Sequence, residues 1–348
     1  MKRFFVGNRP VGEDEPCFVI AEAGVNHNGL LETAFSLVDV AFYAGADAVK
    51  FQTFRPELLA SPTAGKAAYQ QETTDASESQ LAMLEKLALS FDDFAKVKAH
   101  CEKKGIIFLS TPFDYESAAF LDQLGMTCVK IPSGELVNLP FLAHIGSQKK
   151  PVILSTGMGS LEEVRAAVFT LEKAGCPGMA ILQCVSNYPA AAADANLRAM
   201  HTLAQFGYPT GYSDHTLGIE VALASVALGA AVLEKHFTLD KAMEGPDHRC
   251  SLGPDELKAL VAGVRAVQSS LGTGRKEAAV AERDTAMAAR RSLFLRQAVA
   301  AGAVLRAEDL EALRPGDGIS PAKFEQILGR KARHSLPARH KLTMEDLS

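Results

Sequence analysis

Two histidines lie at the ends of neighbouring apolar runs, and they give this sequence its clearest chemical signal. His215 follows the run 208–213, and His236 ends the run 231–236. If both runs are adjacent parallel strands, both imidazoles emerge at the same edge of the sheet. Two imidazoles there can bind one divalent metal that keeps positions open for water and substrate. The competing interpretation is that each is a buried structural histidine.

A second group of residues at the ends of apolar runs suits a small anion. Lys50 and Lys130 end two separate runs, and hydroxyl side chains end others. These hydroxyls belong to Thr111, Ser133 and Ser155. A single lysine at such a position usually reaches solvent. Two inward lysines without partners would be costly, so we expect them to bind a phosphate or carboxylate. The turn 157–160 leads into a helix whose free N–H groups would add to this site.

Two glutamates, Glu22 and Glu135, follow apolar runs in the same way. They would serve as general acid–base groups or orient a hydroxyl. The alternative, that they are partners of the two lysines, is about equally plausible and does not exclude the chemical role. Three further histidines rank lower, two in loops and one on a charged helix: His27, His248 and His100.

The elements that position these residues alternate regularly between short apolar runs and helix-periodic stretches. Eight such units predict one (β/α)₈ barrel rather than an open sheet, with the polar tips converging on its C-terminal face. The expected strands are Cys17–Glu22, Asp47–Gln52, Ile106–Ser110, Thr127–Ile131, Pro151–Ser155, Met179–Gln183, Tyr208–Ser213 and Ala231–His236.

Segments outside this alternation predict the remaining organisation. Residues 3–16 read as a hairpin that covers the bottom of the barrel. The segment Arg55–Glu78 follows the second strand and is expected to cover the substrate. We assign a barrel domain to 1–280, a linker to 281–291 and a small β-rich domain to 292–348. In that last domain, 303–310 resembles 340–347, which predicts a pseudo-symmetric module.

Composition narrows the class of protein. The chain has 348 residues and a net charge of −5, which argues against a nucleic-acid-binding surface. Six cysteines show no C-x-x-C pair, which favours reduced, buried thiols. No signal-peptide core or membrane-spanning run is recognisable, so we expect a cytoplasmic protein.

Eight sequence runs resemble the sialic acid synthases, which make nonulosonic acids from phosphoenolpyruvate and an acylated amino sugar. The C-terminal domain resembles the antifreeze-like (SAF) domain, a β-clip fold. The likeness extends over nearly the whole chain. The runs are Ala21–Gly29, Lys50–Thr53, Ser110–Phe113, Lys130–Glu135, Leu154–Met158, Gly211–Thr216, Glu234–Thr238 and Gly245–His248.

The resemblance implies a role for each matching residue. His215 and His236 would bind Mn²⁺, or Mg²⁺ or Co²⁺ in its place, and Glu22 would lie near the reacting centre. Arg314 would reach into the barrel of a second subunit, which implies a domain-swapped homodimer. Phosphoenolpyruvate would be held by Lys50, Thr111, Lys130, Ser133, Ser155, Ser186 and Ser213. The sugar-binding site would be lined by Gln52, Glu135, Tyr188, Asp247 and Arg314.

The acceptor sugar is the least determined part of the prediction. We expect N-acetylmannosamine, which would give N-acetylneuraminate. The alternative is 2,4-diacetamido-2,4,6-trideoxymannose, which would give N,N'-diacetyllegionaminate. Two features favour that alternative: Arg55–Glu78 lacks the asparagine that N-acetylmannosamine users tend to carry, and Pro132 resembles the legionaminic branch. A phosphosugar synthase ranks lower, and so does a non-catalytic sugar- or ice-binding protein.

Overall fold

The computed structural model describes residues 3–75 and 77–348, which form two compact units. The first unit ends at Gly272, and the second spans Thr273–Ser348. Helix α12 (Arg283–Ala289) occupies most of the segment 281–291 that we assigned to the linker. No helix in the described residues is long and apolar enough to cross a membrane.

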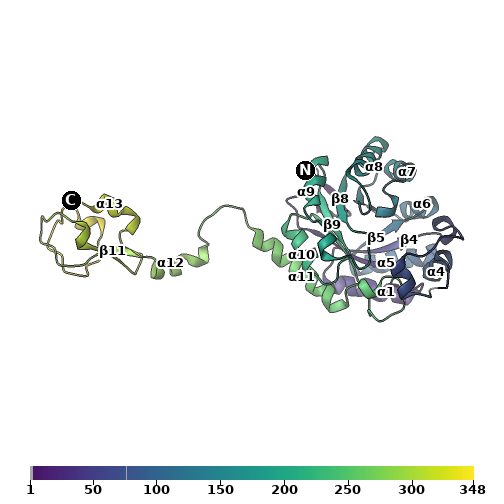
Figure 1. Cartoon of the computed structure of the whole chain (residues 1–348), viewed down its shortest axis with the longest axis horizontal. Coiled ribbons are helices and arrows are strands. Elements are labelled where there is room, and N and C mark those ends of the chain that lie inside the picture. Colours follow the sequence, from purple (N-terminus) through teal and green to yellow (C-terminus); the bar gives the residue numbers. More distant parts are fainter. Residues whose placement is uncertain (1–2, 76) are drawn as a thin grey trace. The chain divides into compact units, whose positions relative to one another are not determined.

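The first unit is a parallel eight-stranded barrel surrounded by helices (Figure 1). Its hydrogen-bonded strand order is β5-β4-β3-β10-β9-β8-β7-β6, and β5 and β6 lie side by side where the ladder ends. The predicted fold class is therefore confirmed. The strands are β3 (Phe18–Gly24), β4 (Ala48–Thr53), β5 (Ile107–Pro112), β6 (Val129–Ile131), β7 (Val152–Ser155), β8 (Met179–Cys184), β9 (Thr210–Asp214) and β10 (Val232–His236).

Each strand is followed by a helix on the outside of the barrel. Local signals set the ends of these helices. Gly45 ends α1 in the left-handed conformation, and Ser90 caps the start of α5. The outer helices are α1 (Leu31–Ala44), α5 (Phe91–Lys104), α6 (Tyr115–Gln123), α7 (Leu139–Ser147), α8 (Leu161–Ala174), α9 (Ala199–Leu203), α10 (Glu220–Ala227) and α11 (Pro254–Leu271).

The predicted N-terminal hairpin is confirmed as β1 (Phe4–Val6) paired antiparallel with β2 (Arg9–Val11). Phe4 packs against Gly178, which lies just before β8. Arg9 forms an ion pair at 2.8 Å with Asp47, just before β4. The hairpin therefore covers the N-terminal ends of the strands and leaves the opposite face of the barrel accessible.

The segment Arg55–Glu78 contains two short helices among its described residues, α2 (Pro56–Leu59) and α3 (Ala68–Thr73). Helix α4 (Gln80–Leu87) follows it. Residues of α4 form a small apolar cluster together with residues from the loops after β3 and β4. The members of this cluster are Val25, Phe54, Ala60, Met83, Leu84 and Leu87. The segment is thus anchored to the C-terminal face of the barrel.

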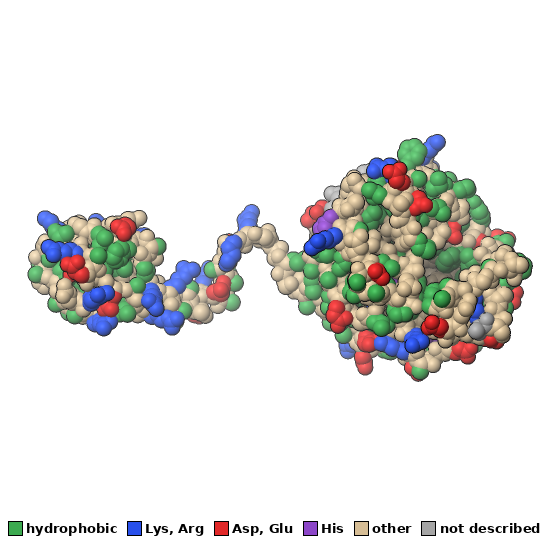
Figure 2. Space-filling model, viewed as in Figure 1, with side chains coloured by type: hydrophobic (Ala, Val, Ile, Leu, Met, Phe, Trp, Pro, Cys, Tyr) green, Lys and Arg blue, Asp and Glu red, His purple; other side chains and the backbone are tan. Residues whose placement is uncertain are grey.

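The second unit contains α12, helix α13 (Phe324–Ile327) and a two-stranded sheet of β11 (Ser292–Leu295) and β12 (Leu310–Leu313). Its predicted internal repeat is confirmed by two matching turns. Asp309 accepts a hydrogen bond from the Arg306 N–H at 2.8 Å, and Asp346 accepts one from the Thr343 N–H at the same distance. Figure 2 shows lysine and arginine side chains spread over this unit, unlike the weakly charged face that ice binding requires.

Candidate active site

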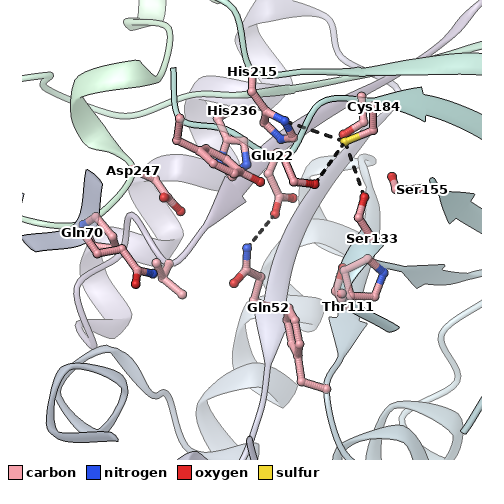
Figure 3. Close-up of a pocket in the computed structure, with 18 of the residues that line it drawn as sticks. Glu22, Gln52, Gln70, Thr111, Ser133, Ser155, Cys184, His215, His236 and Asp247 are labelled. Carbon is pink, nitrogen blue, oxygen red and sulfur yellow. Dashed lines mark hydrogen bonds between the residues drawn. The ribbon is translucent and has the colours of Figure 1, made fainter. Parts of the chain in front are cut away.

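A cavity of about 410 Å³ opens at the C-terminal ends of the barrel strands (Figure 3). Every strand of the barrel, or the loop that follows it, contributes to the lining. The structure brings most of the predicted site residues together there. These are Glu22, Lys50, Gln52, Thr111, Lys130, Ser133, Ser155, Ser186, Tyr188, Ser213, His215, His236 and Asp247.

Two predicted sugar-site residues lie elsewhere. Glu135 is not part of the described lining, and its carboxylate accepts a hydrogen bond from Asn138 Nδ2 at 2.7 Å. Arg314 belongs to the second unit, where its Nε donates to the Ala289 carbonyl at 3.0 Å. The roles of both residues therefore stay predictions.

The two cavity lysines have carboxylate partners, contrary to the expectation that their ammonium groups are unpaired. Lys50 Nζ lies 2.7 Å from Glu22 Oε2 and donates to Thr111 Oγ1 at 3.0 Å. Lys130 Nζ lies 3.3 Å from Glu234 Oε1 and 2.8 Å from Ser155 Oγ. The alternative of a glutamate–lysine pair holds for Glu22. For Lys130 the partner is Glu234 and not Glu135, because Glu234 and Lys130 both point into the barrel.

Glu234 lines the cavity and is one of the residues that our sequence reasoning missed. It is buried in β10, accepts a hydrogen bond from Ser213 Oγ at 3.0 Å and lies 3.8 Å from Lys50 Nζ. Side chains alternate along a strand, so Glu234 shares a face with His236 two residues later. This alternation of side chains along the strand could have identified Glu234 from the sequence.

Burial and nearby charges give the two cavity glutamates different pKa values. Burial, together with the Glu234 carboxylate, raises the pKa of Glu22 to about 7 against the lowering effect of the Lys50 ammonium. Burial alone would also raise the pKa of Glu234, but Lys130 and Lys50 hold that pKa below its usual value. Glu22 can therefore exchange a proton near neutral pH, whereas Glu234 stays ionised.

The hydroxyl cluster requires a glycine beside it. A Cβ on Gly157 would lie 2.3 Å from Ser186 Oγ and 2.9 Å from Ser133 Oγ, so any other residue would displace these hydroxyls. The Gly157 N–H donates to Ser133 Oγ at 2.9 Å. Ser160 and Glu163 satisfy each other's N–H groups in a capping box. The capping box therefore occupies two of the N–H groups at the start of α8, and the contribution of the others to an anion site stays a prediction.

The two histidines face each other as predicted, with ring centroids 5.4 Å apart (Figure 3). His215 Nδ1 donates to the Val185 carbonyl at 2.7 Å, which leaves Nε2 with a lone pair in the neutral ring. Burial and the neighbouring His215 hold the pKa of His236 well below its usual value, and its buried Nδ1 has no hydrogen-bond partner. Both imidazoles therefore suit a divalent metal.

Protein ligands beyond these two imidazoles are scarce. Among the described residues, no group of three or more His, Cys, Asp or Glu side chains is arranged to hold a metal. The Tyr188 ring, which also lines the cavity, packs against His215 with centroids 4.1 Å apart and ring planes inclined at 39°. A metal bound here would keep most of its positions for water and substrate.

Cys184 is a second residue that the sequence did not single out. Its Sγ lies 3.8 Å from His215 Nδ1 and accepts from Ser133 Oγ at 3.5 Å. Burial would raise the pKa of this thiol, but His215 lowers it below its usual value. Cys184 thus connects the hydroxyl cluster to the histidine pair (Figure 3).

The segment Arg55–Glu78 contributes to the cavity, as expected for a substrate-covering loop. Leu59, Tyr69 and Gln70 line it, and the Tyr69 ring stacks on Tyr188 with centroids 5.1 Å apart. Helix α4 adds an apolar wall to the cavity. The wall consists of Met83, Leu84 and Leu87, next to Val25 and Leu59.

Comparison with known families identifies this architecture. The NeuB family model matches residues 37–276, and the SAF domain model matches residues 290–348. The chain belongs to the NeuB family. The predicted class, a phosphoenolpyruvate-dependent, carbon–carbon bond-forming transferase of the sialic acid synthase type, is therefore confirmed.

Several individual proteins resemble this NeuB family member over nearly their full length. It is 45% identical to N,N'-diacetyllegionaminic acid synthase of Legionella pneumophila, covering 98% of this chain and 97% of that protein. The enzyme of the same name from Campylobacter jejuni is 46% identical, with 90% and 95% covered. The crystal structure of N-acetylneuraminic acid synthetase from Leptospira borgpetersenii superposes with a TM-score of 0.72 at 34% identity, covering 82% of this chain and 95% of that one.

Proposed function

We propose that this protein condenses phosphoenolpyruvate with 2,4-diacetamido-2,4,6-trideoxymannose to give N,N'-diacetyllegionaminate and phosphate. One observation carries the choice of sugar over N-acetylmannosamine. Two proteins named as legionaminic acid synthases are 45% and 46% identical to this chain, whereas the N-acetylneuraminic acid synthetase of Leptospira borgpetersenii is 34% identical.

The apolar wall of the cavity supports the same sugar. The diacetamido-trideoxy sugar carries a methyl group at C6 and a second acetamido methyl, where N-acetylmannosamine carries hydroxyls. Burying hydroxyls against Met83, Leu84 and Leu87 would leave them without hydrogen bonds, whereas methyl groups gain from that contact. The wall thus favours the less polar acceptor.

Phosphoenolpyruvate would bind at the bottom of the cavity. Lys50 and Lys130 meet its phosphate and carboxylate groups, and the hydroxyls around them donate further hydrogen bonds. With Glu22 protonated, Lys50, Lys130 and Glu234 together carry one net positive charge, which suits an anionic substrate. The donating hydroxyls belong to Thr111, Ser133, Ser155, Ser186 and Ser213.

The open-chain sugar would lie between this anion site and the apolar wall. Gln52 and Asp247 offer polar groups to its hydroxyls, and the Tyr188 ring limits its position. C3 of phosphoenolpyruvate attacks the aldehyde carbon, and the aldehyde oxygen takes up a proton. Water then adds at C2 and loses a proton. The C2–O bond to phosphate breaks as the C2 hydroxyl loses its proton, which yields the keto acid and inorganic phosphate.

Glu22 is the residue placed to move these protons. Its carboxylate accepts a hydrogen bond from Gln52 at 3.3 Å and pairs with Lys50, so it lies between the anion site and the sugar site. Its pKa of about 7 allows it to give and to take a proton at neutral pH. His215 and His236 would hold Mn²⁺, which when bound supplies Lewis-acid polarisation of a carbonyl oxygen.

The proposal extends to assembly and place of action. Arg314 would complete the sugar site of a second subunit in a domain-swapped homodimer. We expect the protein to act in the cytoplasm. Gel filtration with light scattering tests the dimer directly, because a monomeric mass at working concentration would contradict it.

Phosphate release in the presence of Mn²⁺ and phosphoenolpyruvate tests the function. The account predicts kcat/KM at least about tenfold higher with the diacetamido-trideoxy sugar than with N-acetylmannosamine. A preference for N-acetylmannosamine would refute the proposed sugar, and no release with either would favour a binding protein. Met83→Gln should reduce the preference, whereas the matched control Glu85→Gln, exposed on the same helix, should leave it unchanged.

A further inference from the structure

A buried ion pair lies behind the two histidines, on the side of the strands that faces the helices. Lys235 Nζ lies 2.6 Å from Asp214 Oδ2, and both residues are 1% exposed. Neither lines the cavity, although each is the immediate neighbour of a cavity histidine. Because side chains alternate along β9 and β10, Asp214 and Lys235 point away from the substrate.

The contacts of this pair involve the residues immediately before and after His215 in the sequence. Asp214 Oδ1 accepts hydrogen bonds from the Thr216 N–H at 2.9 Å and from Thr216 Oγ1 at 2.8 Å. Lys235 Nζ also donates to the Thr216 carbonyl. The residues before and after His215 are therefore tied to each other and to one ammonium group.

The same ammonium group connects both histidine segments. Lys235 and Asp214 are directly paired across β9 and β10, and His236 follows Lys235. The separation of the two imidazoles therefore depends on the geometry of this pair. On the cavity side, His215 Nδ1 donates to the Val185 carbonyl and lies 3.8 Å from Cys184 Sγ.

We infer that Lys235, Asp214 and Thr216 form a clamp that positions His215 and His236 at the spacing needed to bind one divalent cation. The inference rests on the proposed metal site. A buried ion pair is often no more stabilising than an apolar pair of the same size, so stability alone gives little reason for it. Groups that hold ligands in place without touching the metal typically contribute 10- to 100-fold to metal affinity.

The test compares the Mn²⁺ affinity of the full-length protein and of the double variant Asp214→Asn/Lys235→Met, without substrate. Free Mn²⁺ is measured by electron paramagnetic resonance, and folding by thermal unfolding in excess chelator. The double variant removes both charges, so no unpaired buried charge remains. The clamp predicts Mn²⁺ binding weakened by about 10- to 100-fold at a largely retained melting temperature.

A second ion pair at the opposite end of the barrel supplies the matched control. Arg265 Nη2 lies 2.7 Å from Asp47 Oδ2, on a side chain that is 5% exposed, and the same oxygen accepts a hydrogen bond from the Val19 N–H at 2.8 Å. The double variant Asp47→Asn/Arg265→Met should leave Mn²⁺ affinity unchanged. If it weakens Mn²⁺ binding as much as the clamp variant, general loosening of the barrel explains both results and the inference is overturned.

The remaining outcomes distinguish a failure of the clamp inference from a failure of the proposed metal site. Unchanged Mn²⁺ affinity in the folded clamp variant overturns the clamp and leaves the proposed function intact. No Mn²⁺ binding by the unaltered protein overturns the metal site, and the clamp with it. If the double variant does not fold, Thr216→Val removes one of the hydrogen bonds to Asp214, and it should weaken Mn²⁺ binding about threefold by the loss of that bond. Unchanged affinity in that variant contradicts the clamp.

Discussion

Asp247 offers a prediction in which stability and activity change in opposite directions. Its side chain is buried in the cavity, and burial raises its pKa from 3.8 to about 6, against the lowering effects of His215 and Lys50. The folded state therefore holds the proton more tightly than the unfolded state. The contribution of this carboxyl to stability is greatest below pH 4, falls as the pH rises towards 6, and levels off above the folded-state pKa once the penalty is complete. At pH 7.5 the ionised carboxylate costs about 3 kcal/mol.

Asp247→Asn should recover most of this cost. The backbone carbonyl of residue 247 accepts hydrogen bonds from Ser251 and Cys250, and the substitution leaves that carbonyl in place. We expect the unfolding temperature of the barrel to rise by about 5 °C at pH 7.5. At pH 4 it should not change, because Asp247 is then protonated.

Scanning calorimetry at both pH values measures this difference, with the exposed Asp194→Asn as the control for loss of one charge. Asp247→Asn should also raise the KM for the sugar and leave the KM for phosphoenolpyruvate unchanged, because we propose that Asp247 binds the sugar. A melting temperature that falls, or rises equally at both pH values, would refute the assignment of a strained carboxylate.

Four further predictions concern the two substrates and the metal. Gly157→Ala should destabilise the barrel by about 1–3 kcal/mol and raise the KM for phosphoenolpyruvate, because the new methyl would overlap Ser186; wild-type kinetics would contradict this close packing. Lys130→Met should raise the KM for phosphoenolpyruvate at least tenfold with little effect on the sugar, as measured by phosphate release. Arg314→Ala should weaken sugar use alone, and unchanged sugar kinetics would count against the swapped arm. His215→Ala or His236→Ala should abolish turnover, so full rate in either variant would exclude the metal assignment.

The sequence predicted the barrel well because its signals are local and repeated. Each expected strand agrees with an observed one to within about two residues, and the hairpin 3–16 also formed as expected. Parallel strands that are buried on both faces leave continuous apolar runs, and the polar residue that ends each run marks the C-terminal face. The polar residues at the ends of the predicted strands therefore identified most of the residues that line the cavity.

Pairings inside the cavity were harder to predict, since they depend on barrel geometry. Lys130 on β6 meets Glu234 on β10 across the interior, and no spacing in the sequence reports that distance. The assignment of Glu135 as a possible lysine partner failed for this reason, because Glu135 faces Asn138 at the start of α7. The capping box of α8 was readable from Ser160 and Glu163, three residues apart, and would have shown that two of the expected N–H groups are already hydrogen-bonded.

Manganese-soaked crystals test the central claim most directly, because anomalous scattering locates the metal without any assumption about the substrate. The account predicts one anomalous peak between the imidazoles of His215 and His236, at the edge of the cavity that holds Lys50 and Lys130. A peak elsewhere, or two rings turned apart with no density between them, would contradict it.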